Sequence, residues 1–99
     1  MSDVFDALAH PVRRKILKML RRGPLSAGDL ADAFELAKPT LSGHFAVLKS
    51  ADLVRTERKG TSIIYRLNMS VLEEAAALLL EIAGAESERG GMKWASVRR

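Results

Sequence analysis

The segment from Lys38 to Ser50 carries the side chains whose types and spacing best suit a binding function. Its apolar and aromatic residues recur at i, i+3, i+4 and i+7, which predicts one buried stripe of a helix: Leu41, His44, Phe45 and Leu48. The outer face carries small residues and few charges: Pro39, Thr40, Gly43, Ala46, Val47 and Ser50, with Lys38 and Ser42 on its flanks. Small hydrogen-bonding side chains suit close approach to another surface, such as a DNA major groove. A surface helix with a weakly polar outer face explains this stretch equally well.

Catalytic groupings are not found in the sequence. The chain has no cysteine, and several of its serines fall at predicted helix starts or beside the outer face just described. No Ser/His/Asp grouping and no glycine-rich phosphate loop is present. The two histidines, His10 and His44, are too few and too far apart to indicate a Zn²⁺ site. We therefore expect no enzyme, no cofactor and no bound metal.

A second basic feature follows this helix. Residues 53–67 alternate apolar and polar side chains around Arg58-Lys59-Gly60-Thr61, a pattern that predicts a β-hairpin with a basic tip. Ile63, Tyr65 and Leu67 fall on one strand face, and Ile64 and Arg66 on the other. The tip is consistent with an ordinary solvated turn, but directly after the preceding helix it favours contact with a phosphate backbone.

Three shorter helices are predicted before residue 38. They span residues 2–9 with Ser2 as cap, 11–22 with Gly23 as C-cap, and 26–34 with Ser26 as cap. A three-residue connection, 35–37, then leads to the helix described first, which is the outline of a helix-turn-helix. The predicted helix 11–22 has six cations and no acid, which favours a phosphate-facing role for some of them over a merely solvated face.

The last predicted helix, residues 71–83, is apolar almost all round. Such a helix must be covered on most sides, and a domain this short cannot cover it alone, which favours a second copy of the chain over packing across its own domain. Residues 85–99 show no sustained period and are expected to form a mobile tail. The sequence assigns no role to Trp94.

Composition bounds the remaining possibilities. The 99 residues are 47% hydrophobic and 28% charged, which predicts one folded domain, expected over residues 1–84. The net charge of +4 favours an anionic partner. Acids stand where a signal peptide needs cations, and no apolar run reaches the length of a membrane span, so we expect a soluble, cytoplasmic protein.

The predicted order is α-α-α-α-β-β-α, a mainly helical winged helix-turn-helix with a β-hairpin wing. The chain resembles the ArsR family of bacterial winged-helix repressors. The matching segments are Ala9-His-Pro-Val-Arg-Arg-Lys-Ile-Leu17, Ser26-Ala-Gly-Asp-Leu-Ala31, residues 38–48, Ala51-Asp-Leu-Val54, and Arg58-Lys-Gly-Thr61 with Tyr65. Within the family, the chain is most similar to the SdpR-type autorepressors, in its segment Lys38-Pro-Thr-Leu-Ser42 and in its short length.

The resemblance implies a homodimer that binds a near-palindromic operator on double-stranded DNA, represses transcription and is released by a signal. It places base reading on Lys38, Pro39, Thr40, Ser42 and Gly43, although Gly43 departs from the larger polar residue usual in the family. The implied wing contacts are Arg55, Arg58, Lys59, Thr61 and Arg66, and Arg13 and Arg14 are candidates for further phosphate contacts. Arg13 matches a family arginine, and the sequence leaves open whether it faces DNA or the domain interior. The terminal helices would form the dimer interface through Val4, Phe5, Leu8, Leu72, Leu78, Leu79 and Ile82. His44 matches a family histidine, and its place on the apolar stripe favours packing over base contact.

Metal sensing, known in the family, is not expected here. The thiolate position near residues 26–31 has no cysteine, and the last helix has Glu73, Glu74 and Glu81 but no histidine. The expected inducer is therefore a protein, such as a membrane-associated one, or a small molecule. The alternative function is a winged helix that binds an acidic protein partner without DNA sequence preference. RNA binding lacks stacking aromatics, since Tyr65 alone lies near the basic tip.

Overall fold

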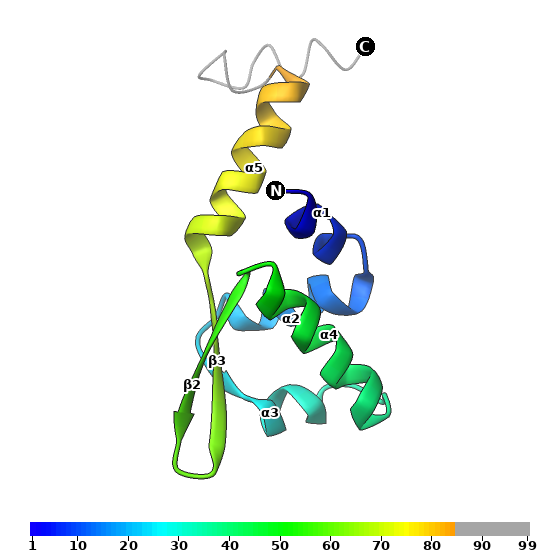
Figure 1. Cartoon of the computed structure of the whole chain (residues 1–99), viewed down its shortest axis with the longest axis vertical. Helices are drawn as coiled ribbons and strands as arrows, with labels where there is room; N and C mark the ends of the chain where they lie inside the picture. The colour runs from blue at the N-terminus through cyan, green and yellow to red at the C-terminus, as the bar shows by residue number, and fades with distance from the viewer. Residues whose placement is uncertain (85–99) are drawn as a thin grey trace. The chain divides into compact units, whose positions relative to one another are not determined.

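The computed structural model describes residues 1–84, so the tail predicted for residues 85–99 lies outside the described residues. The chain divides into two compact units, residues 1–69 and a second unit that begins at Ser70, and the single domain expected over residues 1–84 stays a prediction. The elements in chain order are α1 (Ser2–Leu8), α2 (Pro11–Leu20), β1 (Leu25–Ser26), α3 (Ala27–Asp32), α4 (Lys38–Ser50), β2 (Val54–Lys59), β3 (Ser62–Leu67) and α5 (Met69–Ala83) (Figure 1). This is the predicted helical fold with a hairpin wing.

The first two helices differ from prediction at their ends. Met1, not Ser2, occupies the N-cap of α1, and it makes no side-chain cap bond. The helix α2 begins as expected, with His10 as N-cap and Pro11 in the first turn, but it ends at Leu20 with Arg21 as C-cap. The predicted C-cap role of Gly23 is therefore wrong. Gly23, at φ +151°, lies two residues beyond the cap, where the chain turns toward β1.

The helix α3 is shorter than the predicted span 26–34. Ser26 caps it as predicted, because its Oγ accepts a hydrogen bond from the Asp29 N–H at 3.0 Å. At the other end, the N–H groups of Ala33 and Phe34 bond to carbonyls three residues back, and this tight turn ends the helix. Strand β1 was not predicted. It has only two residues and exists through its pairing with β3, Leu25 opposite Tyr65.

The helix α4 matches its predicted span, and its C-terminus closes in a Schellman motif. The Leu53 N–H bonds to the Leu48 carbonyl and the Asp52 N–H to the Lys49 carbonyl. Asp52 consequently adopts φ +62°, a conformation in which glycine is usual. Its carbonyl accepts a 2.9 Å hydrogen bond from the Asn68 amide, which ties the end of α4 to the end of β3.

The sheet is antiparallel with strand order β1-β3-β2. Gly60 and Thr61 connect β2 to β3, and Gly60 has φ +61°, as a type II′ turn requires at its first central position. The register pairs Thr56 with Tyr65 and Arg55 with Arg66. The core of the first unit lies between this sheet and the helices, and its largest fully buried side chains are Ile16, Leu30, Leu48, Leu53 and Val54.

Candidate nucleic-acid interface

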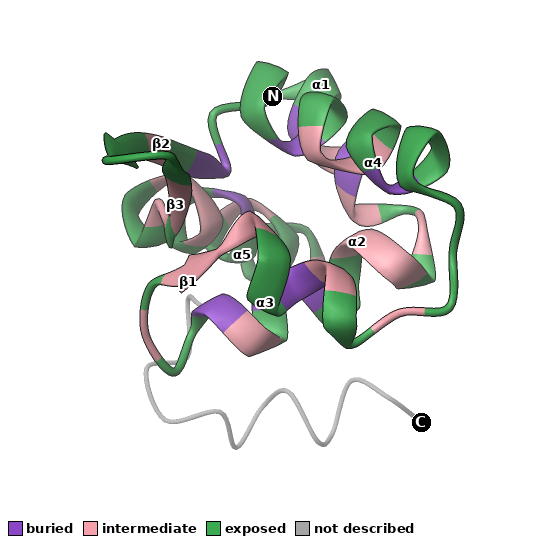
Figure 2. Ribbon diagram, turned by 90° about the horizontal axis from the view of Figure 1, so that it is seen from below, coloured by how far each residue is buried: buried purple, intermediate pink, exposed green. Residues whose placement is uncertain are grey.

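The helix α4 presents the face that the sequence predicts. Leu41 and Leu48 are buried, His44 and Phe45 are half-buried, and buried and exposed residues occupy opposite sides of the helix (Figure 2). All five predicted base-reading positions are exposed: Lys38, Pro39, Thr40, Ser42 and Gly43. The outer face is therefore free within the described chain to contact another molecule.

The packing around residue 43 does not require a glycine. A methyl group built at this position meets nothing within 4 Å, and the backbone is ordinary helix. A glycine inside a helix costs about 0.5–1 kcal/mol relative to alanine. Close approach of a partner to the backbone at this point would explain the residue, and nothing within residues 1–84 does.

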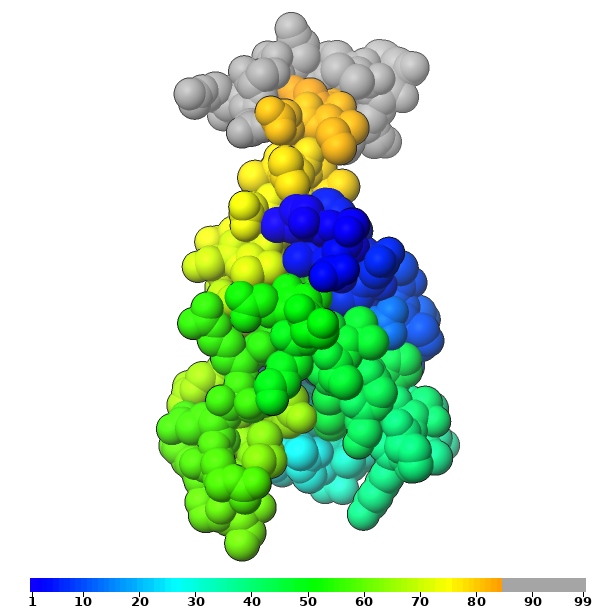
Figure 3. Space-filling view, viewed as in Figure 1, coloured from blue at the N-terminus to red at the C-terminus, as the bar shows by residue number. Residues whose placement is uncertain are grey.

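The hairpin tip carries the exposed cations of the wing. The strand register places Arg58 on the face of Tyr65 and Lys59 on the opposite face, so the two cations flank the tip on both sides. Neither forms an ion pair with any of the described residues. The hairpin tip and the N-terminal end of α4 reach the same end of this unit (Figure 3).

The other two wing arginines have acidic neighbours. Arg66 donates to the Glu57 carboxylate at 3.1 Å, across the pair β2 and β3. Arg55 Nε lies 4.0 Å from the Asp52 carboxylate, and both side chains are largely exposed. Exposed pairs of this kind contribute little to stability, so either arginine can exchange its partner at small cost.

An aromatic contact positions α4 against the wing. The rings of Phe45 on α4 and Tyr65 on β3 have centroids 4.8 Å apart and planes inclined by 39°. Burial also raises the pKa of the Tyr65 hydroxyl above its ordinary value. This contact joins the two elements that the sequence assigns to base reading and to the phosphate backbone.

Arg13 lies in an internal hydrogen-bond network, which argues against the phosphate contact predicted for it. Its Nε and Nη2 donate to the carbonyls of Ala7 and Asp6 at 2.8 and 3.1 Å, and its Nη1 lies 3.1 Å from His44 Nδ1. Arg14 is exposed, but its Nη1 donates to the Leu8 carbonyl at 2.8 Å. Both side chains thus hold the C-terminal end of α1, and sequence spacing gave no sign of these backbone partners.

His44 faces inward, as its place on the apolar stripe indicates. Its ring centroid lies 4.4 Å from that of His10, whose Nδ1 accepts the Val12 N–H and so caps α2. Burial, then the charges of His10 and Arg13, lower the pKa of His44. Because arginine can only donate, His44 Nδ1 must be unprotonated and accept the Arg13 hydrogen bond.

The remaining cations of α2 point away from the outer face of α4. The two helices pack on each other through their buried stripes, with Ile16 and Leu17 on α2. Their exposed faces consequently point in opposite directions. The phosphate-facing role expected for cations of this helix is therefore not supported for the residues on its outer face.

The helix α5 exposes large apolar side chains. Leu79, Leu80 and Ile82 are 52%, 46% and 83% exposed, whereas Leu72 and Leu78 are half-buried. On α1, Phe5 and Leu8 are half-buried, but Val4 is only 5% exposed. Val4 was also predicted to lie in a dimer interface, and the small area that it leaves exposed argues against that position.

Neither a metal centre nor a membrane span is evident in the described part of the chain. Residues 1–84 hold no cluster of three or more His, Cys, Asp or Glu side chains placed to bind a metal ion. No helix in the same range has the length and apolar character needed to cross a membrane.

Comparison with known proteins agrees with this geometry. A helix-turn-helix domain family matches residues 8–57. The transcriptional repressor SdpR of Bacillus subtilis (strain 168) is 42% identical over 80 residues, which cover 81% of this chain and 89% of SdpR. The arsenical resistance operon repressor of Staphylococcus xylosus is 37% identical over 73 residues, covering 74% of this chain and 70% of the repressor.

Solved structures show the same fold. The crystal structure of an ArsR family transcriptional regulator superposes with a TM-score of 0.78 and 29% identity, covering 87% of this chain and 89% of that protein. These relatives are transcriptional regulators and not enzymes. The chain belongs to the ArsR family of DNA-binding helix-turn-helix transcriptional repressors.

Proposed function

We propose that this repressor acts as a homodimer on a near-palindromic operator, with its two α4 helices in successive major grooves about 34 Å apart. Lys38, Thr40 and Ser42 would contact base edges, while Pro39 and Gly43 allow close approach. The observation that carries this proposal is the exposed outer face of α4 at the same end of the unit as the unpaired cations of the wing tip. Membership in a family of DNA-binding repressors disfavours the alternative of an acidic-partner module.

The wing would hold the phosphate backbone through a graded set of contacts. Arg58, Lys59 and Thr61 at the tip are exposed and supply the main contacts. Arg55 and Arg66 contribute after exchanging their acidic neighbours for phosphate. Arg13 and Arg14 bond to carbonyls of α1. They would therefore stabilise the fold and make no contact with phosphate.

The dimer interface would be built mainly from α5. Its exposed Leu79 and Ile82 are apolar side chains for which burial against a second copy is favourable. Leu72, Leu78, Phe5 and Leu8 have area left to bury, but Val4 has almost none.

The releasing signal would be a protein, such as a membrane-associated one, or a small molecule, and not a metal ion. The chain has no cysteine and two histidines, and both histidines use Nδ1 as hydrogen-bond acceptors inside the fold. Coordination of a metal through either Nδ1 would break a bond that positions α2 or α4.

In vitro selection of duplex DNA from a random pool, at two salt concentrations, tests the function. We expect enrichment of an inverted repeat whose half-sites lie about one helical turn apart. Thr40→Ala and Ser42→Ala should relax preference at particular base pairs, by about 1–3 kcal/mol for each hydrogen-bonded base contact that the substitution removes. Weak, salt-sensitive binding without an enriched sequence would contradict the proposal, and an unchanged ranking of operator variants would remove these residues from base reading.

A further inference from the structure

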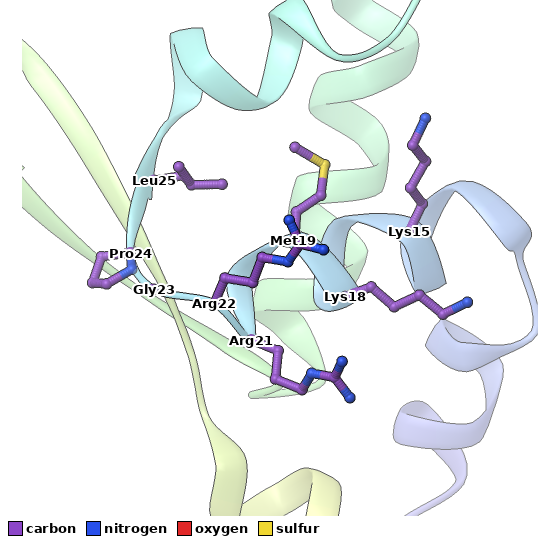
Figure 4. A pocket seen from close by; sticks show the side chains of 8 residues that line it. All are labelled: Lys15, Lys18, Met19, Arg21, Arg22, Gly23, Pro24 and Leu25. Atoms are coloured by element: carbon purple, nitrogen blue, oxygen red, sulfur yellow. The ribbon is translucent and has the colours of Figure 1, made fainter.

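A pocket of about 550 Å³ lies on the outer side of α2, where the chain leads into β1 (Figure 4). Four of its eight lining residues are cations: Lys15, Lys18, Arg21 and Arg22. None of the lining residues is acidic. The pocket therefore gathers as much positive charge as the formal net charge of the whole chain, which is +4.

These four cations are without acidic partners in the described chain. All four are exposed, and the ion pairs found within residues 1–84 involve Arg55 and Arg66 instead. Like charges on one helix face repel each other. The helix C-terminus offsets part of this, but it carries only about half a negative charge. An anion in the pocket would reduce the repulsion that remains.

Part of the pocket wall is apolar, which favours a ligand with an apolar part. Met19 and Leu25 are half-buried and line the pocket together with Pro24. Lys15 Nζ lies 4.9 Å from the centroid of the Phe34 ring, so one rim cation is already associated with an aromatic side chain. Ligand pockets combine an apolar wall with a few polar groups, typically in volumes of roughly 300–1,000 Å³.

The pocket is out of reach of DNA that lies on the reading helix. Viewed toward the pocket, α4 lies behind α2, and the two helices pack on each other (Figure 4). A duplex against the outer face of α4 is thus separated from the pocket by the thickness of both helices. A ligand for the cations around it would therefore be a molecule other than the operator.

We propose that this pocket binds a small organic carboxylate with an apolar body, the carboxylate among the rim cations and the body against Met19, Pro24 and Leu25. The neutral apolar analogue lacks the charge, and inorganic phosphate lacks the body, so neither matches the site. Such a ligand would be a candidate for the small-molecule inducer, and that role alone rests on the proposed function. Its binding does not, because the pocket is complete without DNA.

The test is titration of the ¹⁵N-labelled full chain, free of DNA, with 2-naphthoate and with decanoate below its micelle concentration. Comparison of the two probes distinguishes an aromatic from an aliphatic body. We expect saturable amide shift changes confined to residues 15–25 and 34 for at least one probe. The neutral alcohols of the same skeletons and inorganic phosphate should bind at least about tenfold more weakly.

The double variant Lys18→Gln/Arg22→Gln should lose about tenfold or more in affinity for that probe. The matched variant Arg58→Gln/Lys59→Gln removes the same charge from the wing and should leave the affinity unchanged. Thermal unfolding midpoints identify any variant that is misfolded. Absence of saturation with both carboxylates, equal binding of phosphate, or equal loss in both double variants would overturn the proposal.

Discussion

Arg13 Nη1 lies 3.1 Å from His44 Nδ1 and so joins α2 to α4, the helix proposed to read DNA bases. The same guanidinium donates from its other two nitrogens to the carbonyls of Asp6 and Ala7 at the end of α1. One side chain therefore links the first helix, to which a dimer contact is assigned, with the helix to which base reading is assigned. The orientation of α4 depends on this link as well as on the Phe45 and Tyr65 contact at the wing.

Arg13→Ala should lower the free energy of unfolding by about 1–3 kcal/mol, because two backbone carbonyls and His44 lose their donor in a half-buried site. Urea denaturation measures the change. Arg14→Ala is the matched control, since its exposed side chain makes one bond to α1 and should cost much less. Equal losses in the two variants would contradict the structural role of Arg13.

Acidification should destabilise the protein through His44. Burial, His10 and Arg13 lower its pKa, so protons bind it more weakly in the folded chain than in the unfolded chain, where it titrates near 6.5. The free energy of unfolding is therefore fully retained above pH 6.5 and falls as the pH drops through 6.5 toward the folded pKa. Urea denaturation between pH 8 and pH 5 should show this decline.

His44→Asn separates this effect from other titrations. The Asn carbonyl can accept the Arg13 hydrogen bond but does not titrate, so the decline below pH 6.5 should become shallower while the protein stays folded. An unchanged pH slope in this variant would assign the acid sensitivity to other groups.

Arg58→Ala and Lys59→Ala should weaken binding to all DNA sequences alike. For each phosphate that the wing no longer neutralises, the slope of log affinity against log salt should become shallower by about 0.9. Fluorescence anisotropy at several salt concentrations gives the slopes. Arg21→Ala removes the same charge from the outer side of α2 and should change the slope far less, so equal effects would show that position on the fold is irrelevant.

Gly43→Ala should act in opposite directions on stability and on binding. The added methyl meets open space in the free protein, so the free energy of unfolding should rise by about 0.5–1 kcal/mol. If DNA approaches the backbone here, operator affinity should fall. Paired denaturation and binding measurements test this, and undiminished affinity would exclude close approach at this position.

Leu79→Glu should give monomers, because a charge would replace an exposed apolar side chain of the proposed interface. Light scattering should then report about 10.8 kDa, against twice that mass for the unaltered chain. A variant that remains dimeric would place the interface elsewhere. Thr61→Glu in the wing, also exposed, is the control and should leave the mass unchanged.

Local sequence determined the elements that carry the candidate site. The stripe from Leu41 to Leu48 is periodic over two turns, and α4 has the predicted bounds. Gly60 supplies the positive φ that a two-residue hairpin turn needs, and the alternation around it placed Tyr65 and Ile64 on opposite faces. Such signals were sufficient because helix periodicity, caps and tight turns depend on residues a few positions apart. The roles of the exposed residues on α4 and the wing stay predictions.

Only the tertiary structure decided what depends on distant residues. The strand Leu25–Ser26 exists through pairing with β3, and two residues are too few to show a period. Arg13 looked like another cation of a basic helix, yet its partners are six, seven and thirty-one positions away. The direction of the exposed cations of α2 was likewise decided by tertiary packing. Because α2 packs on α4, these cations point away from the outer face of α4. The charge of a side chain, which the sequence shows, limits the kinds of group that it can bind. Which of those groups lie within its reach depends on how the helices pack.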